Sequence, residues 1–176
     1  MIEVSSKLKE AHHLVATALE GGHRILVFSQ FVQLLKQFSH VLSMENVQFS
    51  YFDGQSSSKQ RKNAIEEFKQ GKQNVFLISL KAGGTGLNLT EADTVIHLDP
   101  WWNPAIEDQA SDRAYRMGQT KPVTVYRLVA RNTVEEKIIH LHEEKRDLAD
   151  KVLSGQSEAA QLKPDVLLDL LVDSHD

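Results

Sequence analysis

Five short apolar runs, separated by segments with helical spacing, constrain the fold of this chain more than any other feature. The runs contain few polar positions, whereas a strand with one face in water alternates apolar and polar residues. Such runs are typical of a parallel sheet that helices cover on both faces. We therefore predict an α/β fold with strands at residues 24–28, 47–52, 74–79, 94–99 and 123–129.

Helices are predicted between and after these strands, because apolar residues recur there at intervals of three and four. Gly21 and Gly22 are expected to end the first helix, and Gly71 the third. Ser57 or Ser58 is expected to cap the start of the third helix. The predicted helices cover residues 8–20, 31–42, 58–70, 104–117, 133–153 and 165–172.

Composition limits the class of protein. The chain has 176 residues and no cysteine, which excludes disulfides and thiolate metal sites and favours an intracellular protein. No apolar run is long enough to span a bilayer, and the first residues do not resemble a signal peptide, so we expect no membrane contact. The histidines lack the spacing of a zinc-binding helix, and we predict no metal ligands.

Charge is distributed unevenly along the chain. The net charge of −4 argues against a protein that coats nucleic acid. Residues 109–131, however, carry five basic side chains and one acidic one, a net of +4. Residues 154–176 carry one basic side chain and five acidic ones, a net of −4. A basic stretch suited to phosphate is thus followed by an acidic tail.

A glycine-rich loop, "SLKAGGTGLNL", follows the third predicted strand. Its backbone amides can form a nest for a phosphate, or its glycines can serve a flexible turn, and the residues alone leave both open. The loop is neither a dinucleotide fingerprint nor a P-loop, and the chain has no P-loop elsewhere. No Asp-Glu pair follows a buried strand either.

Gln109, Asp112, Arg113 and Arg116 fall on one face of the predicted helix at residues 104–117. Two guanidinium groups, an amide and a carboxylate are not a core face. Arginine suits phosphate oxygens because its planar fork can bind two of them, and Asp112 is placed to hold Arg113. The alternative is a solvated face of ion pairs.

Several motifs together resemble the SWI/SNF-type DNA translocases of helicase superfamily two. "RILVFSQF" is similar to motif IV of that family, and "FDGQSSSKQR" to the short motif after it. The stretch from "ISLKAGGTGLNL" through "DPWWNP" and "QASDRAYRMGQ" resembles motifs V and VI. The resemblance implies a RecA-like lobe at residues 23–153. Helical spacing and charge predict an N-terminal helix at 1–22 and an acidic linker with a short C-terminal helix at 154–176.

The resemblance also implies that this is the second of two lobes, with ATP and Mg²⁺ held mainly by a first lobe that carries the P-loop and the Asp-Glu box. Arg116 is then the main arginine finger, and Arg113 a second contact to the γ-phosphate. Gln109, Gly86 and Asp112 are the nucleotide-side candidates. This chain alone is expected not to hydrolyse ATP.

Duplex DNA is expected to lie across the ends of the strands. Phosphate contacts by small and amide groups suit a motor that steps along any sequence. Trp102 is either a DNA contact or a core residue. The resemblance implies DNA contacts from Ser29, Gln30, Gly54, Arg61, Ser79, Lys81, Ala82 and Trp102.

The resemblance thus predicts the second motor lobe of a DNA-dependent ATPase that translocates on duplex DNA and remodels protein–DNA complexes. Its partners would be duplex DNA, the first lobe and a DNA-bound protein. We expect a bacterial chain acting in the cytoplasm or nucleoid, or the nucleus if it is eukaryotic. The alternatives are a non-catalytic interaction module of the same fold and the lobe of a strand-separating helicase.

Overall fold

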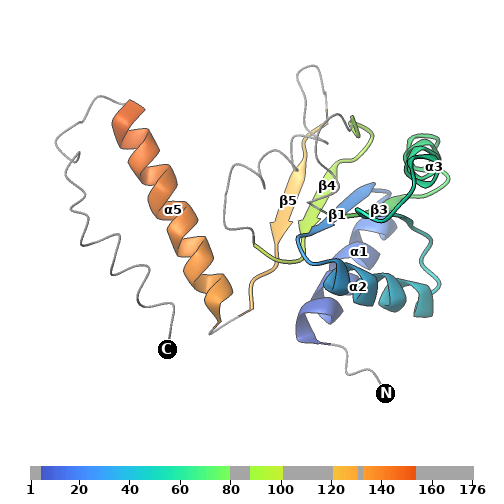
Figure 1. The fold of residues 1–176 in the computed structure, drawn as a ribbon, viewed down its shortest axis with the longest axis horizontal. Coiled ribbons are helices and arrows are strands. Elements are labelled where there is room, and N and C mark those ends of the chain that lie inside the picture. The colour runs from blue at the N-terminus through green and yellow to red at the C-terminus, as the bar shows by residue number, and fades with distance from the viewer. Residues whose placement is uncertain (1–4, 80–87, 101–120, 131–132, 154–176) are drawn as a thin grey trace. The chain divides into compact units, whose positions relative to one another are not determined.

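The computed structural model of the chain describes residues 5–79, 88–100, 121–130 and 133–153 (Figure 1). The chain divides into two compact units, residues 1–130 and residues 131–176. The first unit contains a five-stranded parallel sheet with the order β2-β3-β1-β4-β5. Its strands are β1 (Ile25–Ser29), β2 (Ser50–Phe52), β3 (Val75–Ser79), β4 (Thr94–His97) and β5 (Thr124–Arg127).

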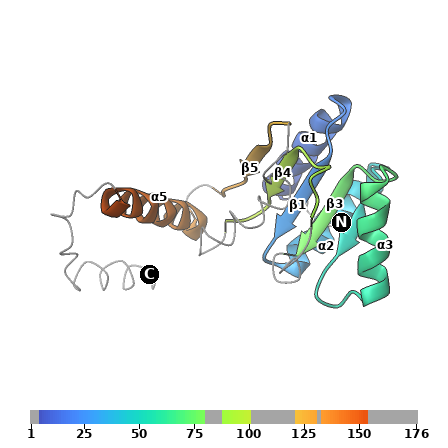
Figure 2. The ribbon, with the colours of Figure 1, turned by 90° about the horizontal axis from the view of Figure 1, so that it is seen from above.

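Helices lie on both faces of the sheet (Figure 2), and alternate residues of β1 pack into two separate cores, one on each face. Leu26 and Phe28 join a core with α3 (Ser58–Lys69), whereas Ile25 and Val27 join a core with α1 (Ser6–Glu20) and α2 (Val32–Met44). Every residue of β1 and β3 is buried, which confirms the predicted parallel sheet with helices on both faces.

The helix ends follow from local sequence. Gly22 has a φ of 74° and Gly71 a φ of 75°, the left-handed conformation that glycine adopts readily, and α1 and α3 end just before them. Ser57 is the cap of α3, and it forms a capping box with Gln60 in which each side chain accepts from the other residue's backbone N–H.

β2 and β5 differ most from the predicted strands, and β4 ends at His97, two residues before the predicted end. β2 is only three residues long, because Val47 and Phe49 pack against the α1/α2 core from a loop instead of joining the sheet. β5 is a parallel strand at one side of the described sheet, and most of its residues are exposed rather than buried. Its apolar sequence therefore predicts the strand but not the burial.

The second unit contains α5 (Val134–Leu153), on which Ile138 and His142 are buried. No helix in the described part of the chain combines the length and apolar character needed to cross a membrane. The helices predicted at 104–117 and 165–172 lie outside the described residues.

Candidate nucleic-acid interface

The carboxyl ends of the five strands meet at one edge of the sheet, because all the strands are parallel. Ligands of open α/β sheets bind at this edge. The register places Ser29 of β1 opposite Ser79 of β3, and Phe28 opposite His97 of β4. Side chains that are far apart in the sequence are thereby brought together.

The loop after β1 is fastened to the end of β4. The Ser29 hydroxyl donates to Asp99 Oδ1, and the Gln30 backbone N–H donates to Asp99 Oδ2 over 3.2 Å. The Gln30 side chain donates from Nε2 to the Pro100 carbonyl at 3.0 Å. Ser29 Oγ also accepts from the Phe31 N–H at 3.0 Å. Ser29 and Asp99 are fully buried, Gln30 is half-buried and Phe31 is exposed.

Ser79, the last residue of β3, is buried beside β1, the strand that leads into this loop. Its hydroxyl has no hydrogen-bond partner among the described residues. A buried hydroxyl without a partner is costly, so this group is a candidate for an interaction with a bound molecule or a further part of the protein.

The turn after β2 is organised by Asp53. Its carboxylate accepts from the Tyr51 hydroxyl at 2.7 Å and from the Gln55 N–H at 2.8 Å. Burial alone would raise the pKa of Asp53, but these hydrogen bonds and the charge of Lys36 together hold it below its usual range. Burial and the neighbouring Asp53 carboxylate in turn raise the pKa of Tyr51. The following Gly54 is exposed and has open space around it.

Arg61 lies on α3, in the first turn after the β2 loop. Its guanidinium carbon is 4.8 Å from the centroid of the Phe52 ring, so a cation–π contact holds the side chain. The same helix face forms an open groove of about 490 Å³. The groove is lined by Ser58, Arg61, Lys62, Ile65, Glu66 and Lys69.

His97 is fully buried at the end of β4 and stacks on Phe28, with ring centroids 5.7 Å apart. Burial, together with the charge of Arg127 on the adjoining strand, lowers the pKa of His97 to about 4. His97 is therefore neutral at physiological pH.

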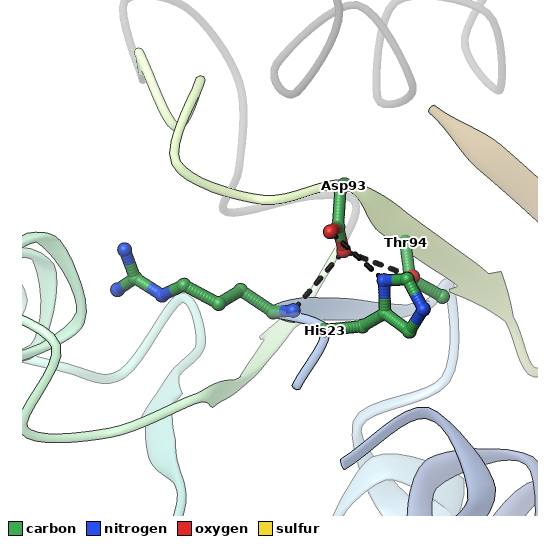
Figure 3. Close-up of polar contacts among 4 residues, drawn as sticks. His23, Asp93 and Thr94 are labelled. Atoms are coloured by element: carbon green, nitrogen blue, oxygen red, sulfur yellow. Dashed lines mark hydrogen bonds and ion pairs between the residues drawn. The ribbon is translucent and has the colours of Figure 1, made fainter. Parts of the chain in front are cut away.

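A second aspartate fastens the opposite edge of the sheet (Figure 3). Asp93, just before β4, accepts from His23 Nδ1 at 2.9 Å, from the Arg24 N–H at 3.0 Å and from the Thr94 hydroxyl at 3.1 Å. Burial alone would raise the pKa of Asp93, but these donors, His23 foremost, lower it. This cluster is on the amino edge, away from the predicted DNA contacts, and it joins the start of β1 to the start of β4.

The structure brings together part of the predicted site. Ser29, Gln30, Gly54 and Ser79 all stand at the carboxyl edge, and Arg61 follows at the start of α3. Outside the described residues lie Lys81, Ala82, Gly86, Trp102, Gln109, Asp112, Arg113 and Arg116.

Asp99 and Asp53 are not among the predicted site residues, although both carboxylates organise loops of this edge. Each is the first acidic residue after an apolar strand, and that position is the signal that could have identified them. In the described part of the chain, no group of three side chains is arranged to hold a metal ion.

Comparison with known proteins adds to this geometry. The family described as "Helicase conserved C-terminal domain" matches residues 6–118. The crystal structure of the C-terminal part of the Fun30 ATPase domain superposes with a TM-score of 0.73 and 37% identity, over 78% of this chain and 45% of that one.

Two curated relatives illustrate the range of similar proteins. An uncharacterised ATP-dependent helicase of Mycoplasma pneumoniae is 43% identical over 154 residues, which cover 87% of this chain and 15% of that protein. The human chromatin-remodeling ATPase INO80 is 38% identical over 178 residues, which cover all of this chain and 11% of that protein. The chain thus spans only a small part of the relatives it matches.

Proposed function

Because this chain belongs to the helicase conserved C-terminal domain family and its relatives are SNF2-family ATPases, we propose that it is the second motor lobe of a DNA-dependent ATPase. The complete protein would translocate on duplex DNA and remodel protein–DNA complexes. Its partners would be duplex DNA, a first RecA-like lobe and a DNA-bound protein that is displaced.

The observation that supports this proposal is the convergence of Ser29, Gln30, Gly54 and Ser79 at one edge of the sheet. β2, β3 and β1 are neighbours in the sheet, so these residues form a row across three strand ends. Polar groups and backbone amides in such a row can contact a phosphate backbone without base-specific information, while Ser29 itself, buried and bonded to Asp99, would order the row from inside. Arg61, held over Phe52, adds a cation to one end of the row.

ATP with Mg²⁺ would supply the phosphoryl group that is transferred to water, and the first lobe would hold most of it. This chain would contribute Arg116 and Arg113, whose positive charge stabilises the charge that spreads over the phosphoryl oxygens. Gln109, Asp112 and Gly86 would complete the nucleotide side. Since the arginines act from the second lobe, hydrolysis would require the lobes to close.

The test is ATP turnover by the full-length protein with and without duplex DNA. Arg116→Ala should leave ATP binding nearly unchanged and reduce DNA-stimulated turnover by roughly 10³-fold or more, the usual effect of losing an arginine finger. Arg116→Lys keeps the charge but not the planar fork, so it should restore little. The isolated chain should not hydrolyse ATP.

Turnover that survives Arg116→Ala would remove this residue from its proposed role. A full-length protein that binds DNA and never hydrolyses ATP would instead favour a non-catalytic interaction module. Strand displacement on a forked duplex would favour a strand-separating helicase over a translocase.

A further inference from the structure

β4 is bracketed by two aspartates, and each binds the backbone at one end of β1. Asp93 accepts from the N–H of Arg24, just before β1, at 3.0 Å. Asp99 accepts from the N–H of Gln30, just after β1, at 3.2 Å. The two carboxylates therefore make matching contacts at opposite edges of the sheet, and only Asp99 is at the edge where the predicted DNA contacts converge.

We propose that Asp99 is a positioning residue that sets the shape of the β1–α2 loop for DNA. It also ties this loop to the end of β4, from which the chain continues into the segment that carries Arg113 and Arg116. The inference rests on the proposed function. Asp99 would not touch DNA or nucleotide itself; it would act through Ser29 and Gln30.

Four hydrogen bonds support this role. Asp99 binds the Ser29 hydroxyl and the Gln30 N–H, the Gln30 side chain binds the carbonyl of Pro100, and Ser29 Oγ binds the Phe31 N–H. Asp99 and Pro100, which follow β4, thus hold the last residue of β1 and the residue after it. The buried carboxylate has both oxygens engaged, so the loop has little freedom to take another shape.

The burial pattern shows which groups this arrangement leaves outside. Ser29 is fully buried and its hydroxyl is used within the protein, so it orders the loop instead of facing outward. Gln30 remains half-buried, and the Phe31 side chain is 55% exposed at the start of α2. The surface that this loop offers to DNA is therefore the one that Asp99 selects.

The chain order gives Asp99 a second consequence. Pro100 is followed directly by residues 101–120, which carry Arg113 and Arg116. A loop shifted by DNA would act on Asp99 and Pro100, and thus on the point from which the arginine segment leaves the sheet. The hydrogen bonds of Asp99 and Pro100 and the chain that follows them would thus connect the loop after β1 with the segment that carries the two arginines.

The test compares Asp99→Ala, Asp99→Asn and Asp93→Ala in the full-length protein. Asp99→Ala should raise the duplex DNA concentration for half-maximal ATPase stimulation by about tenfold, the effect of losing a buried hydrogen bond. Asp93→Ala removes the matching carboxylate at the other edge. Asp93→Ala should lower the melting temperature about as much as Asp99→Ala does, but it should leave basal turnover and the half-maximal DNA concentration unchanged.

Asp99→Asn should keep the DNA concentration for half-maximal ATPase stimulation close to that of the wild-type protein. The amide oxygen can accept from the Gln30 N–H while the amide nitrogen donates to Ser29 Oγ, whose proton then turns to the Phe31 carbonyl at 3.1 Å. If Asp99 acted through its negative charge, Asn would fail as badly as Ala, and that result would overturn the proposal. Equal effects of Asp99→Ala and Asp93→Ala on DNA stimulation would overturn it as well.

Hydrogen exchange separates this inference from the proposed function. Asp99→Ala should speed the exchange of peptide amides at residues 30–31 about tenfold, and Asp93→Ala should not. If the wild-type protein showed no DNA-stimulated turnover, the proposed function would fail, whereas unchanged exchange in Asp99→Ala would show that Asp99 does not hold the loop.

Discussion

At the scale of single residues, His97 shows how burial sets the charge of this sheet edge. The imidazole is packed against Phe28 with the Arg127 charge nearby, and its pKa falls to about 4 from an ordinary value of 6.5. The folded chain therefore takes up the His97 proton at lower pH than the unfolded chain does.

This difference predicts a pH-dependent stability. Because the unfolded state binds the proton first, the free energy of unfolding should fall as the pH drops from about 6.5 to about 4, by on the order of 3 kcal/mol from this histidine. His97→Phe keeps a stacking ring without a titrating group and should flatten the profile in this range. Urea unfolding of the 176-residue chain across this pH range measures the effect.

A matched control is His40→Phe, which changes an exposed histidine on α2 and should leave the profile as it is. Parallel profiles for wild type and His97→Phe would show that another group causes the acid sensitivity.

At the scale of elements, the start of α3 gives a sharp test, because two neighbouring serines differ in role. Ser57 accepts from the Gln60 N–H at 3.2 Å, and Gln60 Oε1 accepts from the Ser57 N–H at 2.8 Å. Ser57→Ala should destabilise the chain by about 1 kcal/mol, the usual cost of losing an N-cap. Ser58→Ala, inside the helix, should change the stability by less than about 0.5 kcal/mol.

Chemical denaturation of both variants checks this prediction. A larger loss for Ser58→Ala than for Ser57→Ala would show that α3 begins one residue later in solution.

The same elements show what the sequence could predict. Periodicity and glycine placement predict α1, α3 and the buried strands β1 and β3, because neighbouring residues determine local packing and where a helix ends. They do not distinguish Ser57 from Ser58, since either serine can cap a helix. The sequence signals overestimate the length of β2, because whether Val47 and Phe49 join the sheet depends on core residues that are distant in the sequence.

The candidate site was predictable to a smaller extent. The predicted strand ends put Ser29, Gly54 and Ser79 at one edge of the sheet, where the structure has them, and their contacts with DNA remain predictions. The link from Ser29 and Gln30 to Asp99 was not predictable, because it joins residues 70 and 69 positions apart across two strands. The predicted roles of Arg113 and Arg116 remain predictions.

At the scale of the whole molecule, a motor that grips phosphates should show salt-dependent DNA binding. In the full-length protein, Arg61→Ala should weaken binding alike for different sequences and lower the slope of log affinity against log salt by about one, the value for one lost phosphate contact. Lys69→Ala, at the far end of α3, removes the same charge away from the carboxyl edge and should leave the slope unchanged.

Fluorescence anisotropy with two unrelated duplexes over a range of salt concentrations measures both quantities. An Arg61→Ala effect limited to one duplex would indicate base readout, and equal slopes in all three proteins would exclude a phosphate contact by Arg61.

The level alignment of the strand ends has a consequence for how this domain can diversify. Backbone pairing, as between Ser29 and Ser79, holds the ends at one height, whereas the helical crossovers only return the chain to the other side. An added turn in α2 would leave the paired strands, and so the residues at the carboxyl edge, in place. One residue inserted within β3 would reverse its inward and outward side chains and displace Ser79 by about 3.3 Å. Lineages of this domain should therefore vary freely in crossover length while keeping strand lengths constant.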